Sequence, residues 1–281
     1  MKPISLYDFY DMFAAARSFA VVGNAGTILS YDNGALIDSH DVVVRFNCAY
    51  TAGVEKQIGS RTDILCANIG KSLAECPSPA TTLQPRCVVH FATKTPRDGN
   101  CESDTFAEWV GDLPALITWA PDLIGIAQGA RTRQLTQGTY ALYTLLRLFK
   151  VERLFVTGFT MYQPTKGTAL KYFGTAVAKV GIQHDLDKEA RIVATILGVF
   201  DGDLQVTPEV QALFSQYAGN IRLRRGFLGQ SGAANRATLL ERLRGRIAWQ
   251  LIRWGFAMRR SLEERSTLDF RAYQQGKKHK F

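Results

Sequence analysis

A glycine-rich turn follows the first apolar run of the chain. The apolar residues Ser18 to Val22 lead directly into Gly23-Asn24-Ala25-Gly26. Glycine lets a ligand approach the backbone closely, and an asparagine side chain offers both a donor and an acceptor. The turn is therefore a candidate ligand-binding site, with a plain strand-ending turn as the alternative. It does not complete the G-x-G-x-x-G pattern of dinucleotide sites.

Two pairs of acidic residues have the D-x-D spacing by which carboxylates can share a divalent ion. They are Asp185 with Asp187 and Asp201 with Asp203. Carboxylate oxygens are suitable ligands for such an ion. Both pairs adjoin predicted helix ends, however, where aspartate is common as a cap. We expect capping, and we predict neither a metal nor a cofactor.

One arginine lies within an apolar run, Val42 to Phe46. A buried guanidinium needs compensating partners, so we expect Arg45 to pair with Asp38, Asp41 or Asp63.

Strand and helix patterns alternate along the first two thirds of the chain. Apolar, β-branched runs predict strands at 18–22, 41–47, 62–68, 86–93, 115–120 and 152–158, and helical periodicity predicts helices at 5–17, 137–149 and 184–200. This alternation predicts an α/β, Rossmann-like, mainly parallel sheet with helices on both faces. In such sheets, ligands bind at the carboxyl ends of the strands, where the turn 23–26 lies.

Four segments of the chain resemble, in order, the sialylmotifs of the sialyltransferases, glycosyltransferase family 29. The large motif matches at Val21 to Gly26, Ile37 to Asp41, Arg45 to Asn47 and Gly59 to Thr62; the small motif at Thr136 to Thr139, Ala141, Leu142 and Val156 to Phe159; motif III at Lys171 to Gly174; and the very small motif at His184 and Glu189. The resemblance implies the sialyltransferase variant of the GT-A fold and metal-independent transfer from a CMP-sugar.

The resemblance also assigns roles to individual residues. It makes His184 the catalytic base, supported by Glu189. It assigns donor binding to Gly23, Asn24, Gly26, Asn47, Thr136, Gln137, Gly138 and Thr139. It assigns stabilisation of the leaving phosphate to Lys171 and Tyr172, although the family usually has His or Tyr where Lys171 stands and Ser-Thr-Gly where Thr136-Gln137-Gly138 stands.

These roles suit the chemistry of an inverting transfer. An acceptor hydroxyl must lose a proton as it attacks the anomeric carbon, and a positioned imidazole typically contributes a factor of about 10² to 10⁴ to such a step. Glu189 lies five residues beyond His184, about 140° around a helix, so a direct pair requires His184 to precede the helix. We expect Glu189 to fix the local backbone; the alternative is a surface charge that pairs with Lys188 or Arg191.

The basic charge is concentrated in the C-terminal tail. Residues 1–219 hold 19 Lys/Arg and 21 Asp/Glu (net −2), whereas residues 220–281 hold 15 and 4 (net +11). Residues 238–262 predict a basic amphipathic helix with Trp254 beside its apolar stripe, which is typical of an anionic membrane surface. The alternatives are a helix docked on the domain and, third, nucleic acid, for which no groove-reading motif is present. We predict a catalytic domain at 1–214 and a linker and tail at 215–281.

The five cysteines are odd in number and contain no C-x-x-C pair. This pattern supports neither a disulfide framework nor a zinc site, and we expect Cys48 and Cys66 to be reduced core residues. His40 and His90 are expected to be structural. With no signal-like N-terminus, the chain is predicted to be a cytoplasmic, bacterial-type member, peripheral on the membrane.

The sequence predicts an inverting glycosyltransferase that moves sialic acid, or Kdo, from its CMP form to a glycan or glycolipid hydroxyl. Two other hypotheses stay open at this point. One is a dinucleotide-binding oxidoreductase on the same layered fold. The other is a non-catalytic membrane-surface protein that kept the fold and lost the reaction. The differences from the family motifs at Gln137 and Lys171 favour this second hypothesis.

Overall fold

The computed structural model describes residues 1–68, 76–92, 103–119, 135–161, 168–170, 172, 177–179 and 184–217. The chain divides into two compact units, Met1–Gly229 and Gln230–Phe281. The predicted tail helix at 238–262 lies outside the described residues, and so does Lys171.

A single parallel sheet forms the centre of the first unit. Its strands are β1 (Lys2–Pro3), β2 (Ser18–Val22), β3 (Val42–Phe46), β4 (Ile64–Cys66), β5 (Cys87–Ala92), β6 (Pro114–Trp119), β7 (Arg153–Thr157) and β10 (Asp203–Val206), in the order β1-β6-β5-β4-β3-β2-β7-β10. Every pairing within it is parallel. β8 (Thr168–Leu170) and β9 (Val177–Lys179) form a separate antiparallel pair. The predicted α/β class is therefore confirmed.

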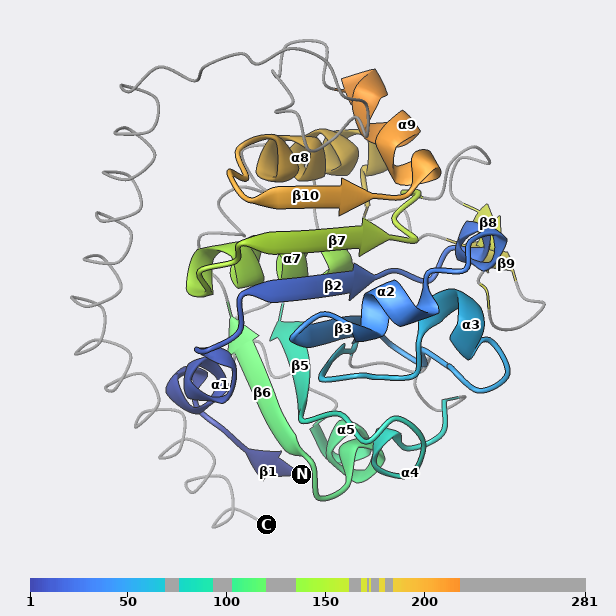
Figure 1. Ribbon diagram of the computed structural model, residues 1–281. Helices are drawn as coiled ribbons and strands as arrows, with labels where there is room; N and C mark the ends of the chain where they lie inside the picture. Colours follow the sequence, from blue (N-terminus) through green and yellow to red (C-terminus); the bar gives the residue numbers. More distant parts are fainter. Residues whose placement is uncertain are drawn as a thin grey trace. The chain divides into compact units, whose positions relative to one another are not determined.

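The order of strands reverses at β2. From β2 the chain steps through β3, β4, β5 and β6 to one side, and then returns to place β7 on the other side of β2 (Figure 1). A reversal of this kind leaves a crevice outside the carboxyl ends of the two strands that flank it, because the connections leave on opposite faces. The turn after β2 and the turn after β7 must therefore meet.

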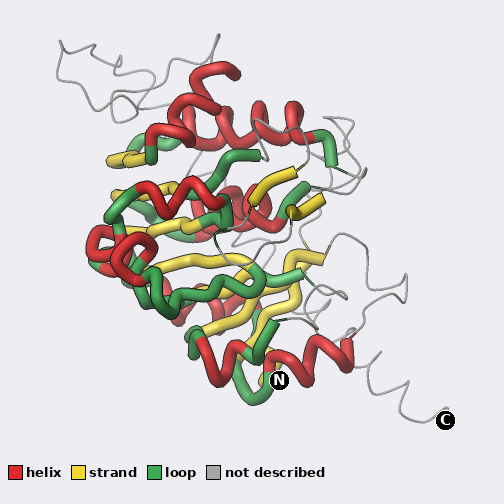
Figure 2. The backbone as a smooth tube through the Cα atoms, turned by 90° about the vertical axis from the view of Figure 1, so that its right-hand side faces the viewer, coloured by secondary structure: helices red, strands yellow, loops and turns green. Residues whose placement is uncertain are grey.

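The helices are α1 (Leu6–Phe13), α2 (Gly34–Asp38), α3 (Glu55–Ile58), α4 (Pro79–Thr82), α5 (Ser103–Val110), α7 (Gln137–Leu148), α8 (Leu186–Gly198) and α9 (Pro208–Tyr217), with a 3-10 turn, η1 (Gly26–Ser30), after β2. In Figure 2 the strands lie between layers of helix.

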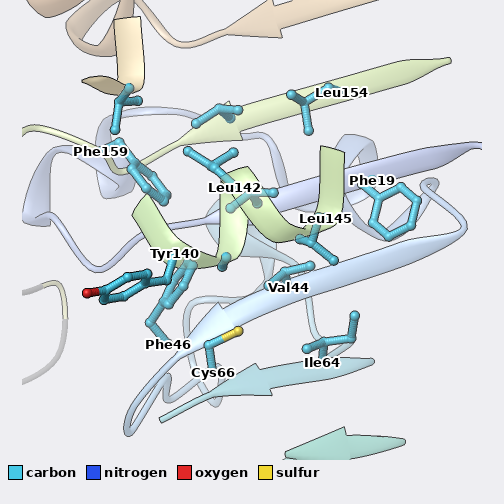
Figure 3. Packing of buried hydrophobic residues seen from close by; sticks show 14 of the residues in the cluster. Phe19, Val44, Phe46, Ile64, Cys66, Tyr140, Leu142, Leu145, Leu154 and Phe159 are labelled. Carbon is cyan, nitrogen blue, oxygen red and sulfur yellow. The ribbon is translucent and has the colours of Figure 1, made fainter. Parts of the chain in front are cut away.

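Alternating residues of each strand explain why both faces are covered. In β2, Phe19 and Val21 join the large core cluster, to which α1, α7, α8 and α9 contribute. Figure 3 shows part of this cluster, with Phe19 of β2 and Leu142 and Leu145 of α7. Ala20 and Val22 point the other way and pack with Ile28 of η1 and with residues of α2 and α3. Because successive side chains of a strand face opposite sides, an uninterrupted apolar run such as this requires cover on both.

Polar side chains set the starts of the long helices. Ser5 and Asp8 form a capping box at α1, Thr136 accepts the backbone N–H of Thr139 at α7, and Asp185 accepts that of Lys188 at α8. Such caps satisfy donors that the first turn of a helix leaves unpaired. The cap at Asp185 confirms the capping interpretation of the first D-x-D pair, and it leaves His184 before the helix.

The last described elements were not predicted. β10 is a four-residue edge strand, and α9 follows it at once and runs to Tyr217, past the predicted boundary after residue 214. Among the described residues, no helix has the length and hydropathy needed to cross a bilayer.

The expectation that Cys48 is a reduced core residue is wrong. Cys48 forms a disulfide with Cys76, 28 positions further on, with the two Cα atoms 5.2 Å apart. Spacing along the chain does not reveal which cysteines meet, because the pairing depends on the fold that brings them together. Cys66 and Cys87 are free and buried, as expected for Cys66.

Candidate functional site

Two glycines meet at the point where the strand order reverses. The backbone N–H of Gly23 donates to the carbonyl oxygen of Thr157 at 2.8 Å, and that of Ala25 donates to Gly158 at 3.3 Å. A Cβ on Gly23 would lie 2.2 Å from the Gly158 carbonyl oxygen, and Gly158 has a φ of +71°. Only glycines fit this contact, so the large-motif and small-motif turns lie directly against each other.

Phe159 links three of the matched segments. A Cβ built on Gly23 would lie 3.0 Å from its ring, and one built on Gly138 would lie 2.7 Å from it. The ring also meets Phe46 edge-on, with centroids 5.7 Å apart (Figure 3). The sequence marks Phe159 only as part of a motif, and its contact with both Gly23 and Gly138 depends on the fold.

Asn24 lies at the carboxyl end of β2, next to this contact. Its Nδ2 donates to the Phe46 carbonyl oxygen at 2.9 Å. Its Oδ1 is shielded from solvent and has no hydrogen-bond partner among the described residues. A shielded acceptor of this kind is costly unless a ligand or water donates to it, so Asn24 is prepared to accept a hydrogen bond from a bound hydroxyl.

Asn47 occupies the corresponding position after β3. Its φ is +54°, a left-handed conformation that asparagine tolerates better than most residues. Its backbone N–H donates to the Cys66 carbonyl at 2.9 Å, and its Oδ1 accepts the backbone N–H of Asn68 at 3.0 Å. The side chain is thus held over the carboxyl ends of β3 and β4.

Glu189 connects the small motif to His184. It is fully buried, and its Oε1 accepts hydrogen bonds from the backbone N–H of Thr136, at 2.8 Å, and from the hydroxyls of Thr136 and Thr139. Its Oε2 lies 3.9 Å from Nδ1 of His184, whose side chain is 14% exposed. The surface-charge alternative for Glu189 is therefore wrong, and the direct His–Glu approach arises because His184 precedes α8.

Burial raises the pKa of Glu189, because desolvation disfavours a carboxylate. The hydrogen bonds from Thr136 and Thr139, and the charge of His184, act in the opposite direction. Desolvation is the larger effect, and the three donors compensate for part of it.

Several residues predicted to bind the donor also make contacts that support the fold. The side-chain amide of the buried Gln137 makes two hydrogen bonds with the backbone of Phe91 in β5. Its Oε1 accepts the Phe91 N–H at 3.3 Å, and its Nε2 donates to the Phe91 carbonyl oxygen at 3.1 Å. Thr139 is fully buried against Glu189, and Gly138 gives room to Phe159. These contacts support the segment around Thr136, and the predicted donor contact of the three residues stays a prediction. Gly26 begins η1 two residues after Asn24.

Tyr172, expected near the leaving phosphate, touches the large motif. Its backbone N–H donates to the Asn24 carbonyl oxygen at 3.2 Å, and its side chain packs beside Val54 against the core cluster formed with η1, α2 and α3. Burial raises the pKa of its hydroxyl, whereas the charge of Arg45 lowers it. Tyr172 therefore bonds to the Asn24 turn through its backbone, and its predicted role near the phosphate stays a prediction.

The expected acidic partner of Arg45 is also corrected. Arg45 donates to two backbone carbonyls, of Arg61 at 2.8 Å and of Ile58 at 2.6 Å. Asp63 pairs with Arg61 at 2.9 Å instead. Main-chain oxygens thus satisfy the guanidinium only in part, since Nη1 of Arg45 is buried without a hydrogen-bond partner among the described residues, and the two bonds tie β3 to the end of α3.

The D-x-D pairs are already engaged in the fold. Asp187 accepts a hydrogen bond from the Tyr217 hydroxyl, and Asp203 accepts one from the Gln205 side chain. Asp203 lies at the amino end of β10, whereas Asn24 follows the carboxyl end of β2. Within the described residues, no group of three or more His, Cys, Asp or Glu side chains is placed to hold a metal.

The comparisons with known proteins agree with the sialylmotif resemblance. Residues 12–86 match the model of glycosyltransferase family 29 (sialyltransferase). This segment of the chain is therefore similar to that family. The match contains Gly23, Asn24 and Asn47, the residues at the carboxyl ends of β2 and β3 where the strand order reverses.

Curated proteins match this chain over short segments. The beta-1,6-galactosyltransferase GALT29A of Arabidopsis thaliana is 51% identical over 69 residues, 24% of this chain and 17% of its own length. The human beta-galactoside alpha-2,6-sialyltransferase 2 is 54% identical over 52 residues, 18% of this chain and 10% of its own. The aligned part is thus well under two thirds of either relative.

Two solved sialyltransferases are also similar. One is a mammalian enzyme, with 21% identity and a TM-score of 0.46 over 69% of this chain and 70% of that one. The other is the monofunctional alpha-2,3-sialyltransferase Cst-I of Campylobacter jejuni, with 11% identity and a TM-score of 0.48 over 85% and 88%. Identity and TM-score are both low, so these two structures carry no argument about the function of the chain.

Proposed function

We propose that the protein is an inverting glycosyltransferase that moves an acidic sugar, sialic acid or Kdo, from its CMP form to a hydroxyl of a glycan or glycolipid. One observation carries the proposal: Phe159 lies against both Gly23 and Gly138 of the two motif turns, and Glu189 links Thr136 of the second turn to His184. A nucleotide site and a proton acceptor side by side are what a sugar transfer from a nucleotide requires.

In the proposed reaction, His184 accepts the proton of the acceptor hydroxyl as its oxygen bonds to the anomeric carbon. The bond between that carbon and the CMP phosphate oxygen breaks, and CMP leaves with the electron pair. Glu189, 3.9 Å away, stabilises the resulting imidazolium. Asn24 Oδ1, shielded and without a partner in the described part of the chain, receives a hydrogen bond from a ribose hydroxyl of the donor.

Calorimetric titration with CMP, UDP and NADH, each with EDTA present, tests the donor class. We expect CMP to bind, and binding to be lost in Asn24→Ala and Asn47→Ala. Asn33→Ala is the matched control, because Asn33 makes no side-chain bond at the start of α2. No CMP binding, or binding of NADH alone, would overturn the proposal and favour the oxidoreductase.

Turnover is tested by CMP release from CMP-sialic acid and CMP-Kdo. We expect His184→Ala to keep CMP affinity and to lose release by about 10² to 10⁴-fold. Unchanged release in this variant would reject His184 as the base. CMP binding without release from any donor would favour the non-catalytic alternative.

A galactosyltransferase is a second candidate, because the segment is 51% identical to an enzyme of that name. The same titration separates the two. Tight binding of UDP with weak binding of CMP, followed by turnover of UDP-galactose, would favour the galactosyl donor.

We further propose that the tail contacts an anionic membrane through 238–262, on the basis of the net charge of +11 over residues 220–281. Co-sedimentation with phosphatidylserine vesicles, with and without residues 230–281, tests this. The cytoplasmic location stays a prediction, and the Cys48–Cys76 bond removes the reduced-cysteine argument for it, because disulfides persist mainly in oxidising compartments.

A further inference from the structure

The disulfide lies directly beside a nucleotide-site residue. Cys48 follows Asn47, and its partner Cys76 precedes α4. The large-motif resemblance included Arg45 to Asn47 and gave no role to the cysteine that follows. A covalent bond at this position therefore calls for an explanation from the local geometry.

The turn that contains Cys48 has an unfavourable backbone. Asn47 and Ala49, on either side of it, have φ values of +54° and +39°. A left-handed conformation is disfavoured for residues with a Cβ, and two such residues in one turn persist only where their surroundings impose them. Something must hold this turn in place.

The attachments of the turn are few and identifiable. Asn47 is held by its bonds to Cys66 and Asn68, and Ala49 is fully buried in the cluster with Cys76, Phe106 and Val110. Cys76 is itself anchored, because its carbonyl oxygen accepts the Trp109 indole N–H at 3.1 Å. The disulfide thus connects the turn to a fixed point beside α5.

We propose that Cys48 and Cys76 are positioning residues of the nucleotide site, whose disulfide holds Asn47 in its binding conformation. The inference rests on the proposed function, since it takes Asn47 as a donor contact. Reduction removes the constraint on the turn, and Asn47 relaxes toward ordinary φ values. Thiol reagents would then modulate donor affinity without reaching the catalytic pair.

The test compares CMP affinity in oxidised and reduced protein, and in Cys48→Ala/Cys76→Ala, at a temperature where circular dichroism shows all forms to be folded. We expect the Kd for CMP to rise about tenfold, the effect of losing one well-placed hydrogen bond. Cys87→Ala is the matched control: it removes a buried sulfur at the amino end of β5, away from the turn, and should leave affinity unchanged.

A double-mutant cycle separates positioning from general stabilisation. If the disulfide acts through Asn47, Asn47→Ala should cost much less affinity in the reduced protein than in the oxidised one, whereas Asn24→Ala should cost the same in both. Additive losses at Asn47, or equal Kd values for oxidised and reduced protein, would overturn the inference. So would the absence of a Cys48–Cys76 linked peptide in non-reducing mass spectrometry.

Failure of the proposed function gives a different result. If the oxidised protein does not bind CMP, the donor assignment fails. Amide hydrogen exchange then tests separately whether the disulfide constrains the turn. Faster exchange of the amides of residues 47–49 on reduction, with no change in β7, would support the constraint on the turn. Unchanged exchange would reject it.

Discussion

Removing the Glu189 carboxylate should destabilise the junction between α7 and α8. In Glu189→Ala, the Thr136 N–H and the two threonine hydroxyls lose their shared acceptor. The hydroxyls can turn to other acceptors, but the backbone N–H cannot. A buried unsatisfied donor costs about 1–3 kcal/mol, and the cavity adds to this, whereas losing a desolvated carboxylate offsets part of it. We expect a net loss of about 2–4 kcal/mol in the free energy of unfolding.

Glu189→Gln should lower activity while leaving the free energy of unfolding nearly unchanged. Its amide oxygen can still accept from Thr136, so unfolding should change by about 1 kcal/mol or less. The group facing His184 is then neutral, and the imidazolium formed in the reaction loses an anionic neighbour 3.9 Å away. We expect kcat to fall about 10- to 100-fold, less than in His184→Ala, with CMP affinity unchanged.

Urea unfolding and CMP release measure the two effects. Glu55→Ala is the control, since Glu55 is an exposed carboxylate in the first turn of α3, and its loss should change stability by less than about 0.5 kcal/mol. If Glu189→Ala unfolds at the same urea concentration as the wild type, the hydrogen bonds of Glu189 do not stabilise the junction between α7 and α8. If Glu189→Gln keeps full kcat, the carboxylate does not assist His184.

Three further predictions concern the frame around the site. Gly23→Ala should unfold or abolish CMP binding, because its Cβ meets the Gly158 backbone at 2.2 Å, whereas Gly138→Ala meets only the Phe159 ring at 2.7 Å and should be milder; thermal melts and titration compare them. Burial lowers the pKa of His90, so the unfolded state takes up a proton that the folded state refuses, and stability should fall as pH drops below about 6.5; a smaller loss in His90→Asn would confirm the source. Asp203→Ala should leave CMP release unchanged with EDTA or Mg²⁺, and a metal-dependent defect would restore the D-x-D interpretation.

The sequence predicted the layered fold because its signals are local. Continuous apolar runs marked β2, β3 and β7, and helical periodicity marked α7 and α8, each within a few residues of the observed bounds. β10 was not predicted because a strand of four residues gives little periodic pattern, and α9 after it was not predicted either. The Cys48–Cys76 bond escaped because it joins residues that only the fold brings together.

The site was predicted less completely than the fold, for a physical reason. A motif match marks that a residue matters and does not separate ligand contact from support. Gln137 and Arg45 both fall in matched segments, yet their polar groups bond to backbone, to Phe91 and to Ile58 and Arg61. The shielded Oδ1 of Asn24 has no partner in the described structure, but the same holds for Nη1 of Arg45, so burial without a partner does not by itself separate the two roles.

The same distinction bears on which sugar is carried. Asp38 accepts the N–H groups of Ser60 and Arg61, and Asp41 accepts those of Arg17 and Ser18, so much of the large motif's polarity holds the crevice together. A segment with this task should be similar among relatives that differ in donor. The chain is indeed about equally identical to segments of a galactosyltransferase and of a sialyltransferase. For the proposed transferase we therefore predict that the donor sugar is set largely outside residues 12–86, and a donor screen of the whole protein tests this prediction.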